Sequence, residues 1–475
     1  MNALRTAQIN RSHHAAAPPG FYQSQGMRLI LSKPWRTKCY SQSTWEELGP
    51  TPVEQVGWRE IRFFAYNYVL VWLTCCYSSS EKVQVSSCDT TYSTESSPAP
   101  SPMRIFTVDD YGARADGSDD RKAFVKVWEE ACSSSDSAVI LVPEMKTYLL
   151  KPVTFSGPCR AHITLMIKGT LEASSEPSVW SDEKDKEPWI KFKKIRNLLV
   201  QGGGTLNGNG HIWWQNSCKT NKSMPCFNAP TALYFSECKD LTVEDLKIRD
   251  SQQIHLVFGG CSNVEASRLK ITAPEWSPNT DGIHVTSTKN MLISYCSIGT
   301  GDDCISIVNG SRNIKATNIL CGPGHGISIG SLGAKRSIAH VSNVIVEKAI
   351  LKNTTNGVRI KTWQGGHGYV KNIIFQDVSV HNVSNPIIIN QSYCDSMKPC
   401  HTQKSAVAIS NVLYKNIKGI SASETAVILN CSSTVGCKDV ELQNIDLFRE
   451  DGDHTYASCN NVQWTGVGRI SPRCT

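Results

Sequence analysis

The sequence predicts an all-β solenoid of stacked coils. Two observations support this prediction: a short motif recurs along the chain, and helical periodicity is lacking. The motif is a basic or polar residue, then Asn or Asp, then an apolar run. It recurs at Asn197, Asp240, Asn263, Asn290, Asn313, Asn343, Asn372, Asn416 and Asp439. Successive copies are 43, 23, 27, 23, 30, 29, 44 and 23 residues apart. A variable period of about 20–30 residues with β-branched strands is typical of a β-solenoid.

The two long steps are near twice the short ones, so we expect one copy of the motif to be missing from each. Asn tolerates left-handed backbone and forms side-chain ladders, which suits the turn between coils. The alternative fold is a β-sandwich whose turn residues recur by coincidence, which so many recurrences make the weaker interpretation. One coil cannot bury its apolar face alone, so the stack is expected to form one elongated domain.

The chain divides into residues 1–103, an irregular Ser- and Pro-rich segment, and residues 104–475, the solenoid. The first segment ends in a linker at 96–102 and contains an apolar run at 63–76. That run is short for a membrane span and suits a secretory signal, although it is far from Met1. Either translation begins downstream of Met1 or the run is a signal anchor.

A short N-terminal capping helix is expected where the solenoid begins. Asp119-Asp120 offers an N-cap. An apolar stripe at helical spacing follows, at Ala123, Phe124, Val127, Trp128 and Ala131.

Composition narrows the class of protein. Hydrophobic residues make up 40% and charged residues 19%, which excludes a disordered chain and a coiled coil. The net charge of +7 permits a polyanionic partner but lacks the concentrated positive charge of a nucleic-acid binder. We therefore expect no nucleic-acid partner.

The 19 cysteines indicate an oxidising compartment, and the odd count leaves at least one thiol free or paired between chains. Local disulfides are expected for the close pairs Cys218/Cys226, Cys394/Cys400, Cys431/Cys437 and Cys459/Cys474, and Cys132/Cys159 could tie down the capping helix. Buried free thiols are expected at Cys238, Cys261 and Cys296. The spacing does not suit zinc, so no structural metal is expected. Glycosylation sequons at Asn221, Asn309, Asn353, Asn382, Asn390 and Asn430 fit a secreted glycoprotein.

Polar residues in the middle of the solenoid follow the coil period. They are Asn279-Thr280-Asp281-Gly282, Gly301-Asp302-Asp303, Gly324-His325-Gly326 and Arg359-Ile360-Lys361. Asp302 follows Asp281 by 21 residues, His325 follows by a further 23 and Arg359 by 34 more. Because neighbouring strands lie about 4.8 Å apart, steps of one coil predict a single patch on one face.

This patch offers the groups that glycoside hydrolysis needs. Close carboxylates repel one another, so one is expected to hold a proton near neutral pH and another to act as a base. Asp302 and Asp303 can share a site only where the strand bends, which Gly301 would permit. The side chains of Arg359 and Lys361 share one strand face and could bind a substrate carboxylate, and His325 could donate a hydrogen bond to the acid.

Each motif alone has a structural interpretation. Asn-Thr-Asp-Gly is usually a turn, an Asp-Asp pair a surface or metal-binding feature, and Arg-x-Lys a solvated strand face. Their combination at coil spacing makes a shared structural explanation improbable, because the separate explanations are independent.

The set Asn-Thr-Asp, Gly-Asp-Asp, Gly-His-Gly and Arg-Ile-Lys resembles the polygalacturonases, glycoside hydrolases of family 28, in their plant type. The resemblance covers residues 104–475 and includes Val108–Ala113 and Gly203–Gly208. It implies a right-handed parallel β-helix that hydrolyses the α-1,4-galacturonosyl bonds of pectin (homogalacturonan) with inversion, without a cofactor or metal. It also implies a Cys304–Cys321 disulfide.

The resemblance assigns roles residue by residue. Asp302 matches the general acid, Asp281 and Asp303 match the carboxylates that activate water, and His325 matches the residue that supports the acid. The substrate binders that it implies are Asn279, Arg359, Lys361 and Tyr393. An inverting enzyme is expected to hold acid and base about 6.5–9.5 Å apart.

We therefore expect a secreted, monomeric cell-wall enzyme, endo-acting, with no stable membrane association unless the run 63–76 is an uncleaved anchor. Two alternatives stay open: a β-helical pectate lyase, which would need calcium and a cationic base, and a pectin-binding solenoid without activity.

Overall fold

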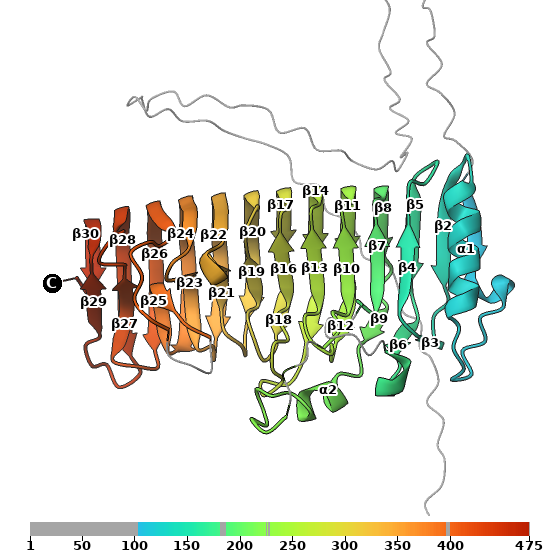
Figure 1. Ribbon diagram of the computed structural model, residues 1–475, viewed down its shortest axis with the longest axis horizontal. Helices are drawn as coiled ribbons and strands as arrows, with labels where there is room; N and C mark the ends of the chain where they lie inside the picture. Colours follow the sequence, from blue (N-terminus) through green and yellow to red (C-terminus); the bar gives the residue numbers. More distant parts are fainter. Residues whose placement is uncertain (1–102, 181–186, 225, 227–228, 396–399, 475) are drawn as a thin grey trace, which may run out of the picture. The chain divides into compact units, whose positions relative to one another are not determined.

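The computed structural model describes residues 103–180, 187–224, 226, 229–395 and 400–474, which Figure 1 draws in colour. They belong to one compact unit, Ser93–Thr475. The apolar run 63–76 and the linker 96–102 lie outside the described residues, as does the rest of the segment before Met103.

Two parallel sheets make up this unit. Within the described residues the first sheet has 19 strands: β1 (Met103–Thr107), β2 (Ser137–Val142), β3 (Thr147–Leu150), β5 (Ile163–Ile167), β6 (Thr170–Ala173), β8 (Arg196–Gln201), β9 (Thr205–Asn207), β11 (Lys239–Glu244), β12 (Lys247–Arg249), β14 (Ser262–Ser267), β15 (Lys270–Thr272), β17 (Lys289–Ser294), β18 (Ser297–Gly299), β20 (Arg312–Cys321), β22 (Ile338–Lys352), β24 (His367–Val383), β26 (Ala408–Ser421), β28 (Cys437–Arg449) and β30 (Val462–Ser471). The second sheet has 11 in the same part of the chain: β4 (Val153–Ser156), β7 (Ile190–Lys193), β10 (Leu233–Ser236), β13 (Leu256–Gly259), β16 (Ile283–Thr286), β19 (Ile305–Ile307), β21 (Ile327–Leu332), β23 (Asn356–Trp363), β25 (Asn385–Tyr393), β27 (Thr425–Asn430) and β29 (Tyr456–Asn460).

The core lies inside the coils, where the same strand position recurs at each level. In the second sheet Ile283 pairs with Ile305, Ile305 with Ile327 and Ile327 with Val358, and all four side chains are buried. Stacked apolar columns of this kind bury each coil against its neighbours, as the repeat predicts. The residues between them, such as Ser306, point to the other face.

The predicted capping helix is α1 (Arg121–Ser133), which covers the N-terminal end of the stack (Figure 1). All five residues of the predicted apolar stripe are buried. Asp120 is the N-cap residue, but its carboxylate accepts hydrogen bonds from the backbone N–H of Arg114 (2.7 Å) and Ala115 (3.2 Å) instead of from the helix. A second short helix, α2 (His211–Gln215), lies in a loop after β9, and the described residues also form 3-10 turns at η1 (Val108–Tyr111), η2 (Pro177–Val179) and η3 (Ala334–Arg336).

The expected Asn ladder is present at one corner of the coils. Each Nδ2 donates to the Oδ1 of the coil before it, over 2.7–3.1 Å, along Asp240, Asn263, Asn290, Asn313, Asn343, Asn372 and Asn411. Each of these residues has a positive φ between 53° and 59°. Left-handed backbone with a side-chain bond between coils is the role that Asn suits best.

The expectation of missing motif copies is wrong. Lys239 pairs directly with Arg196, so the step of 43 residues is one coil enlarged by the loop that contains α2. The coil after Asn372 is marked by Asn411, and Asn416 belongs to a second ladder with Asp377. Long steps therefore mark loops that leave the coil.

All six expected disulfides are present in the described part of the chain: Cys132–Cys159, Cys218–Cys226, Cys304–Cys321, Cys394–Cys400, Cys431–Cys437 and Cys459–Cys474. Cys238, Cys261 and Cys296 are buried free thiols, as expected. Among the described residues, the helices are too short or too polar to span a membrane.

Candidate active site

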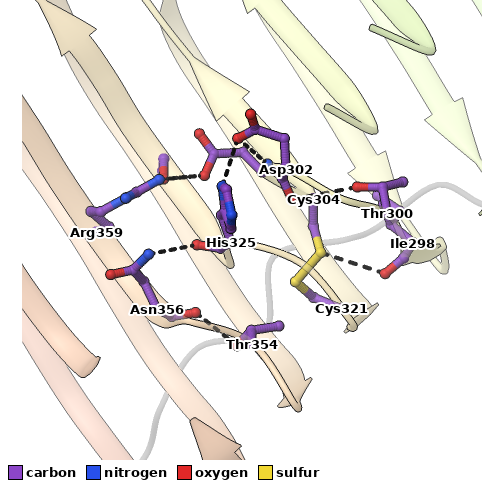
Figure 2. Close-up of a disulfide and its surroundings, with 11 residues drawn as sticks. Ile298, Thr300, Asp302, Cys304, Cys321, His325, Thr354, Asn356 and Arg359 are labelled. Atoms are coloured by element: carbon purple, nitrogen blue, oxygen red, sulfur yellow. Dashed lines mark hydrogen bonds and ion pairs between the residues drawn. A yellow bond between two sulfur atoms is a disulfide. The ribbon is translucent and has the colours of Figure 1, made fainter. Parts of the chain in front are cut away.

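Most of the predicted site residues lie on or just before consecutive strands of the second sheet. Asp281, Asp303 and His325 each lie two residues before a paired isoleucine of β16, β19 or β21. The parallel register therefore stacks them along one wall. Asp302 comes from the same bend as Asp303, and Figure 2 shows Asp302 and His325 together with Arg359 of β23.

The Asp302 carboxylate and the His325 ring are hydrogen-bonded in the site. His325 Nδ1 lies 2.9 Å from Asp302 Oδ1, and Asn279 Nδ2 donates to Asp302 Oδ2 over 3.5 Å. The hydrogen bond to Asp302 raises the pKa of His325 above its ordinary value, and burial opposes this. The loop is fixed from below, because Asn356 Nδ2 donates to the His325 carbonyl over 3.2 Å (Figure 2).

Asp303 is buried, 1% exposed, and two cations contact it. Its Oδ1 lies 2.6 Å from Arg359 Nη2 and its Oδ2 lies 2.7 Å from Lys361 Nζ. Ser328 Oγ donates to Oδ1 over 2.9 Å. Burial alone would raise the pKa of Asp303, but Lys361 and Arg359 outweigh burial and hold it below its ordinary value. Asp303 is therefore ionised in the folded protein.

Asp281 lies in the opposite electrostatic setting. Ser306 Oγ donates to its Oδ2 over 2.6 Å, and His284 Nδ1 lies 3.9 Å from the same oxygen. Burial and the neighbouring Asp302 carboxylate raise the pKa of Asp281. The pKa values of two carboxylates one coil apart are thus shifted in opposite directions, upward for Asp281 and downward for Asp303.

Most of the predicted residues meet at one hollow of about 400 Å³. Its lining includes Asn279, Asp281, Asp302, Asp303, Lys361 and Tyr393. Both Asp302 and Asp303 reach the hollow from a bend. His325 and Arg359 do not line it, because His325 lies against Asp302 and Arg359 lies behind Asp303. The Lys361 ammonium lies 5.3 Å from the centre of the Tyr393 ring. Burial raises the pKa of Tyr393 to about 12.

One ligand atom each of Asp302, Asp303 and His325 lies within 4.8 Å of the others. The separation of about 6.5–9.5 Å expected for an inverting glycosidase is measured between whole carboxyl groups, and it applies to Asp281 as well as to Asp303 as the partner of Asp302. It stays a prediction. The bend at Gly301 brings adjacent residues of the chain to one site, which limits how far apart their carboxylates can be.

The same three residues are close enough to hold a metal ion. However, both Asp303 oxygens already bind cationic side chains. A metal ion at this position would be repelled by Arg359 and Lys361.

Sequence reasoning missed the hydroxyl groups that bind these carboxylates. Ser306 and Ser328 each follow their carboxylate by 25 residues. His284, Ser306, Ser328 and Arg359 are paired across adjacent strands. The available signal was the polar residue between two apolar ones, as in Ile305-Ser306-Ile307, at the same strand position in successive coils.

Comparison with known proteins decides the family. The model of glycosyl hydrolases family 28 matches residues 132–471. This chain belongs to that family. Its fold is the right-handed parallel β-helix that the sequence predicted.

Similar curated proteins share most of the chain. Polygalacturonase QRT2 of Arabidopsis thaliana is 53% identical over 386 residues, which cover 81% of this chain and 86% of the relative. A polygalacturonase of Persea americana is 56% identical and covers 77% of this chain and 78% of the relative.

Solved structures support the fold. Polygalacturonase from Erwinia carotovora has a TM-score of 0.63 at 23% identity, covering 77% of this chain and 97% of that chain. Endo-xylogalacturonan hydrolase from Aspergillus tubingensis has a TM-score of 0.65 at 23% identity, covering 77% and 100%. At this identity the likeness concerns the fold alone.

Proposed function

We propose that the chain is a polygalacturonase that hydrolyses the α-1,4-galacturonosyl bonds of pectin. The family and the names of its relatives support this activity. The observation that carries the proposal is one hollow that combines three carboxylates in different electrostatic settings with a buried ammonium. Glycoside hydrolysis needs an acid and a base side by side, and an anionic sugar needs a cation.

Asp302 is the proposed general acid. Among the described residues no lysine or arginine forms an ion pair with it. Its hydrogen bonds with His325 and Asn279 fix the carboxyl group at the hollow, where it can protonate the leaving oxygen. His325 acts through Asp302.

Asp281 and Asp303 are the proposed water activators, and the reaction inverts the anomeric centre. Asp303 is a poor nucleophile for a retaining reaction, because both of its oxygens are bonded to cations. A carboxylate held in this way can still orient and polarise water. Ionised Asp281 supplies the stronger base, since its pKa is raised.

Lys361, Asn279 and Tyr393 are the proposed substrate binders that line the hollow, and Arg359 is proposed to support substrate binding from behind Asp303. Lys361 and Tyr393 line the hollow together, so a sugar ring on Tyr393 would bring its carboxylate toward the ammonium. Arg359 holds Asp303 in place and adds positive charge behind it.

The deciding experiment compares Asp302→Asn with Asp281→Asn on polygalacturonate and on a galacturonoside with an aryl leaving group. The aryl group leaves without protonation, so it should restore turnover to Asp302→Asn and not to Asp281→Asn. Rescue of Asp281→Asn alone would instead make Asp281 the acid, because its raised pKa also suits a proton donor. The anomer first released, followed by NMR, tests inversion, and a retained anomer would contradict it.

The same assay separates the alternatives. A lyase would yield an unsaturated product that absorbs in the ultraviolet and would lose activity with a chelator. Binding without new reducing ends would indicate a non-catalytic solenoid. We propose internal cleavage, for which viscosity should fall faster than reducing ends appear.

We also propose that the protein is a secreted, cell-wall glycoprotein and a monomer. Its six disulfides within the described residues suit an oxidising compartment. Secretion into plant culture medium, endoglycosidase sensitivity and light scattering test these three properties.

A further inference from the structure

An exposed aromatic cluster lies beside the catalytic hollow. Trp276 is 58% exposed. Its ring centre is 5.4 Å from that of Trp214 and 5.8 Å from that of His211, both nearly perpendicular to it. The indole of Trp276 therefore stands on a fixed aromatic base while much of its surface meets solvent. Exposed rings of this kind mark binding sites more often than scattered aliphatic residues do.

The surroundings hold this indole in place. Trp214 belongs to α2, is 2% exposed and donates its Nε1 hydrogen to the carbonyl of Ser251 over 3.0 Å. Next to Trp276, Ser277 Oγ donates to the Pro274 carbonyl over 2.6 Å and lies 2.7 Å from Thr280 Oγ1. A ring fixed in advance loses little conformational entropy when a ligand binds.

The cluster is continuous with the proposed active site. One hollow of about 580 Å³ is lined by Trp276, His211, Trp214 and Asp250 among others. A neighbouring hollow of about 210 Å³ shares Trp214 with it and shares Asn279 with the catalytic hollow. Figure 1 shows α2 and the adjoining loop below strands β12 and β18. The three hollows thus follow one another from the carboxylates to Trp276.

We propose that Trp276, supported by Trp214 and His211, is a distal subsite that binds a methyl-esterified galacturonate of the polysaccharide whose cleavage is proposed above. The inference rests on that function for its ligand. A pyranose ring has an apolar C–H face that packs on an indole.

The charges around this hollow favour an esterified galacturonate over one with a free carboxylate. Asp250 lines this hollow, and among its described lining residues there is no lysine or arginine. Arg249 is the partner of Asp250, at 3.2 Å. The catalytic hollow, in contrast, contains Lys361. A free sugar carboxylate would face Asp250 and would find Arg249 already paired with it, whereas a methyl ester carries no charge.

Trp276→Ala tests the subsite, with Tyr295→Ala as the matched control, since Tyr295 is 65% exposed and does not line these hollows. Trp276→Ala should lower kcat/KM on partly methyl-esterified galacturonan by about 3- to 10-fold through a higher KM, as expected for one lost aromatic contact. Short unesterified oligomers should be cleaved as before, and Trp276→Phe should recover part of the loss. The control should match the wild type on all substrates.

Binding is measured separately by affinity electrophoresis in gels that contain esterified or unesterified galacturonan. We expect Trp276→Ala to lose retardation mainly in the esterified gel, and Asp250→Asn to gain retardation in the unesterified gel. An equal loss in both gels, an equal loss on short oligomers, or no loss at all would overturn the subsite. Wild-type protein that binds esterified polymer through Trp276 but cleaves neither esterified nor unesterified galacturonan would support the subsite while refuting the proposed hydrolysis.

Discussion

Lys361→Met tests whether Asp303 is held ionised by its cations. The substitution removes an ammonium 2.7 Å from Asp303 Oδ2 and keeps most of the apolar side chain. The side chains of Lys361 and Asp303 are only 8% and 2% exposed, so solvent cannot replace the lost partner. Arg359 at 2.6 Å and Ser328 at 2.9 Å remain.

The size of the effect follows from that partial loss. Removing a partner that leaves a buried charge uncompensated costs about 3–5 kcal/mol. Because Asp303 retains one cation and one hydroxyl group, we expect Lys361→Met to lower the free energy of unfolding by about 2–3 kcal/mol at pH 7. The matched control is Lys315→Met, since the Lys315 side chain is 47% exposed and pairs with Glu347 at 2.9 Å. Its loss should stay below about 1 kcal/mol.

The pH dependence provides the sharper test. The pKa of Asp303 is lowered in the folded protein, so its contribution to stability is present above the ordinary Asp pKa and is lost as pH falls through the folded value. In Lys361→Met this pKa rises, and protonation relieves the uncompensated charge. The gap in urea midpoint between wild type and variant should therefore be largest near neutral pH and shrink on acidification. If the gap is independent of pH, or is no larger than that of Lys315→Met, then Asp303 is not held ionised by Lys361.

Three further predictions concern other contacts. Ser306→Ala removes the hydroxyl group that stabilises ionised Asp281, whose pKa is already raised, so the acid limb of kcat/KM should move up by roughly 0.5–1 pH unit in a pH–rate profile. Asn313→Ala should lower the urea midpoint more than Asn313→Gly does, because both lose the ladder bond but only Ala is strained at φ 57°. Replacing Cys304 and Cys321 by Ser opens a 17-residue loop beside the site and should destabilise the protein by about 3 kcal/mol, measured by thermal unfolding.

The features that were predictable from sequence are those that local spacing determines. The coil motif identified the solenoid, and the short Cys–Cys separations identified the closed loops. The acidic, histidine and Arg-Ile-Lys motifs were predicted to meet because the parallel register converts a step of one coil into proximity, whereas Tyr393 was named from the family resemblance alone. The long steps were misread because sequence spacing alone does not distinguish two coils from one coil with a long loop, such as the loop that contains α2.

The partners of the carboxylates were not predictable in the same way. The sequence places Asp302 and Asp303 at a bend, but it does not say which of the two turns inward. The structure turns Asp303 toward Arg359 and Lys361 and leaves Asp302 at the hollow with His325. That choice depends on tertiary packing of β23, which lies more than 50 residues away in sequence.

The repeat itself explains why two similar carboxylates acquire different chemistry. Asp281 and Asp303 hold equivalent positions, and each accepts a hydrogen bond from the serine 25 residues later. The hydroxyl partner is therefore common to both and cannot separate their pKa values. What differs is the next neighbour along the stack, which is the Asp302 carboxylate for Asp281 and the cations of β23 for Asp303. In a stack of similar coils, the pKa of each carboxylate is thus set by the side chains of the neighbouring coils. Exchanging one of those side chains is therefore expected to change the pKa of the carboxylate without moving its backbone.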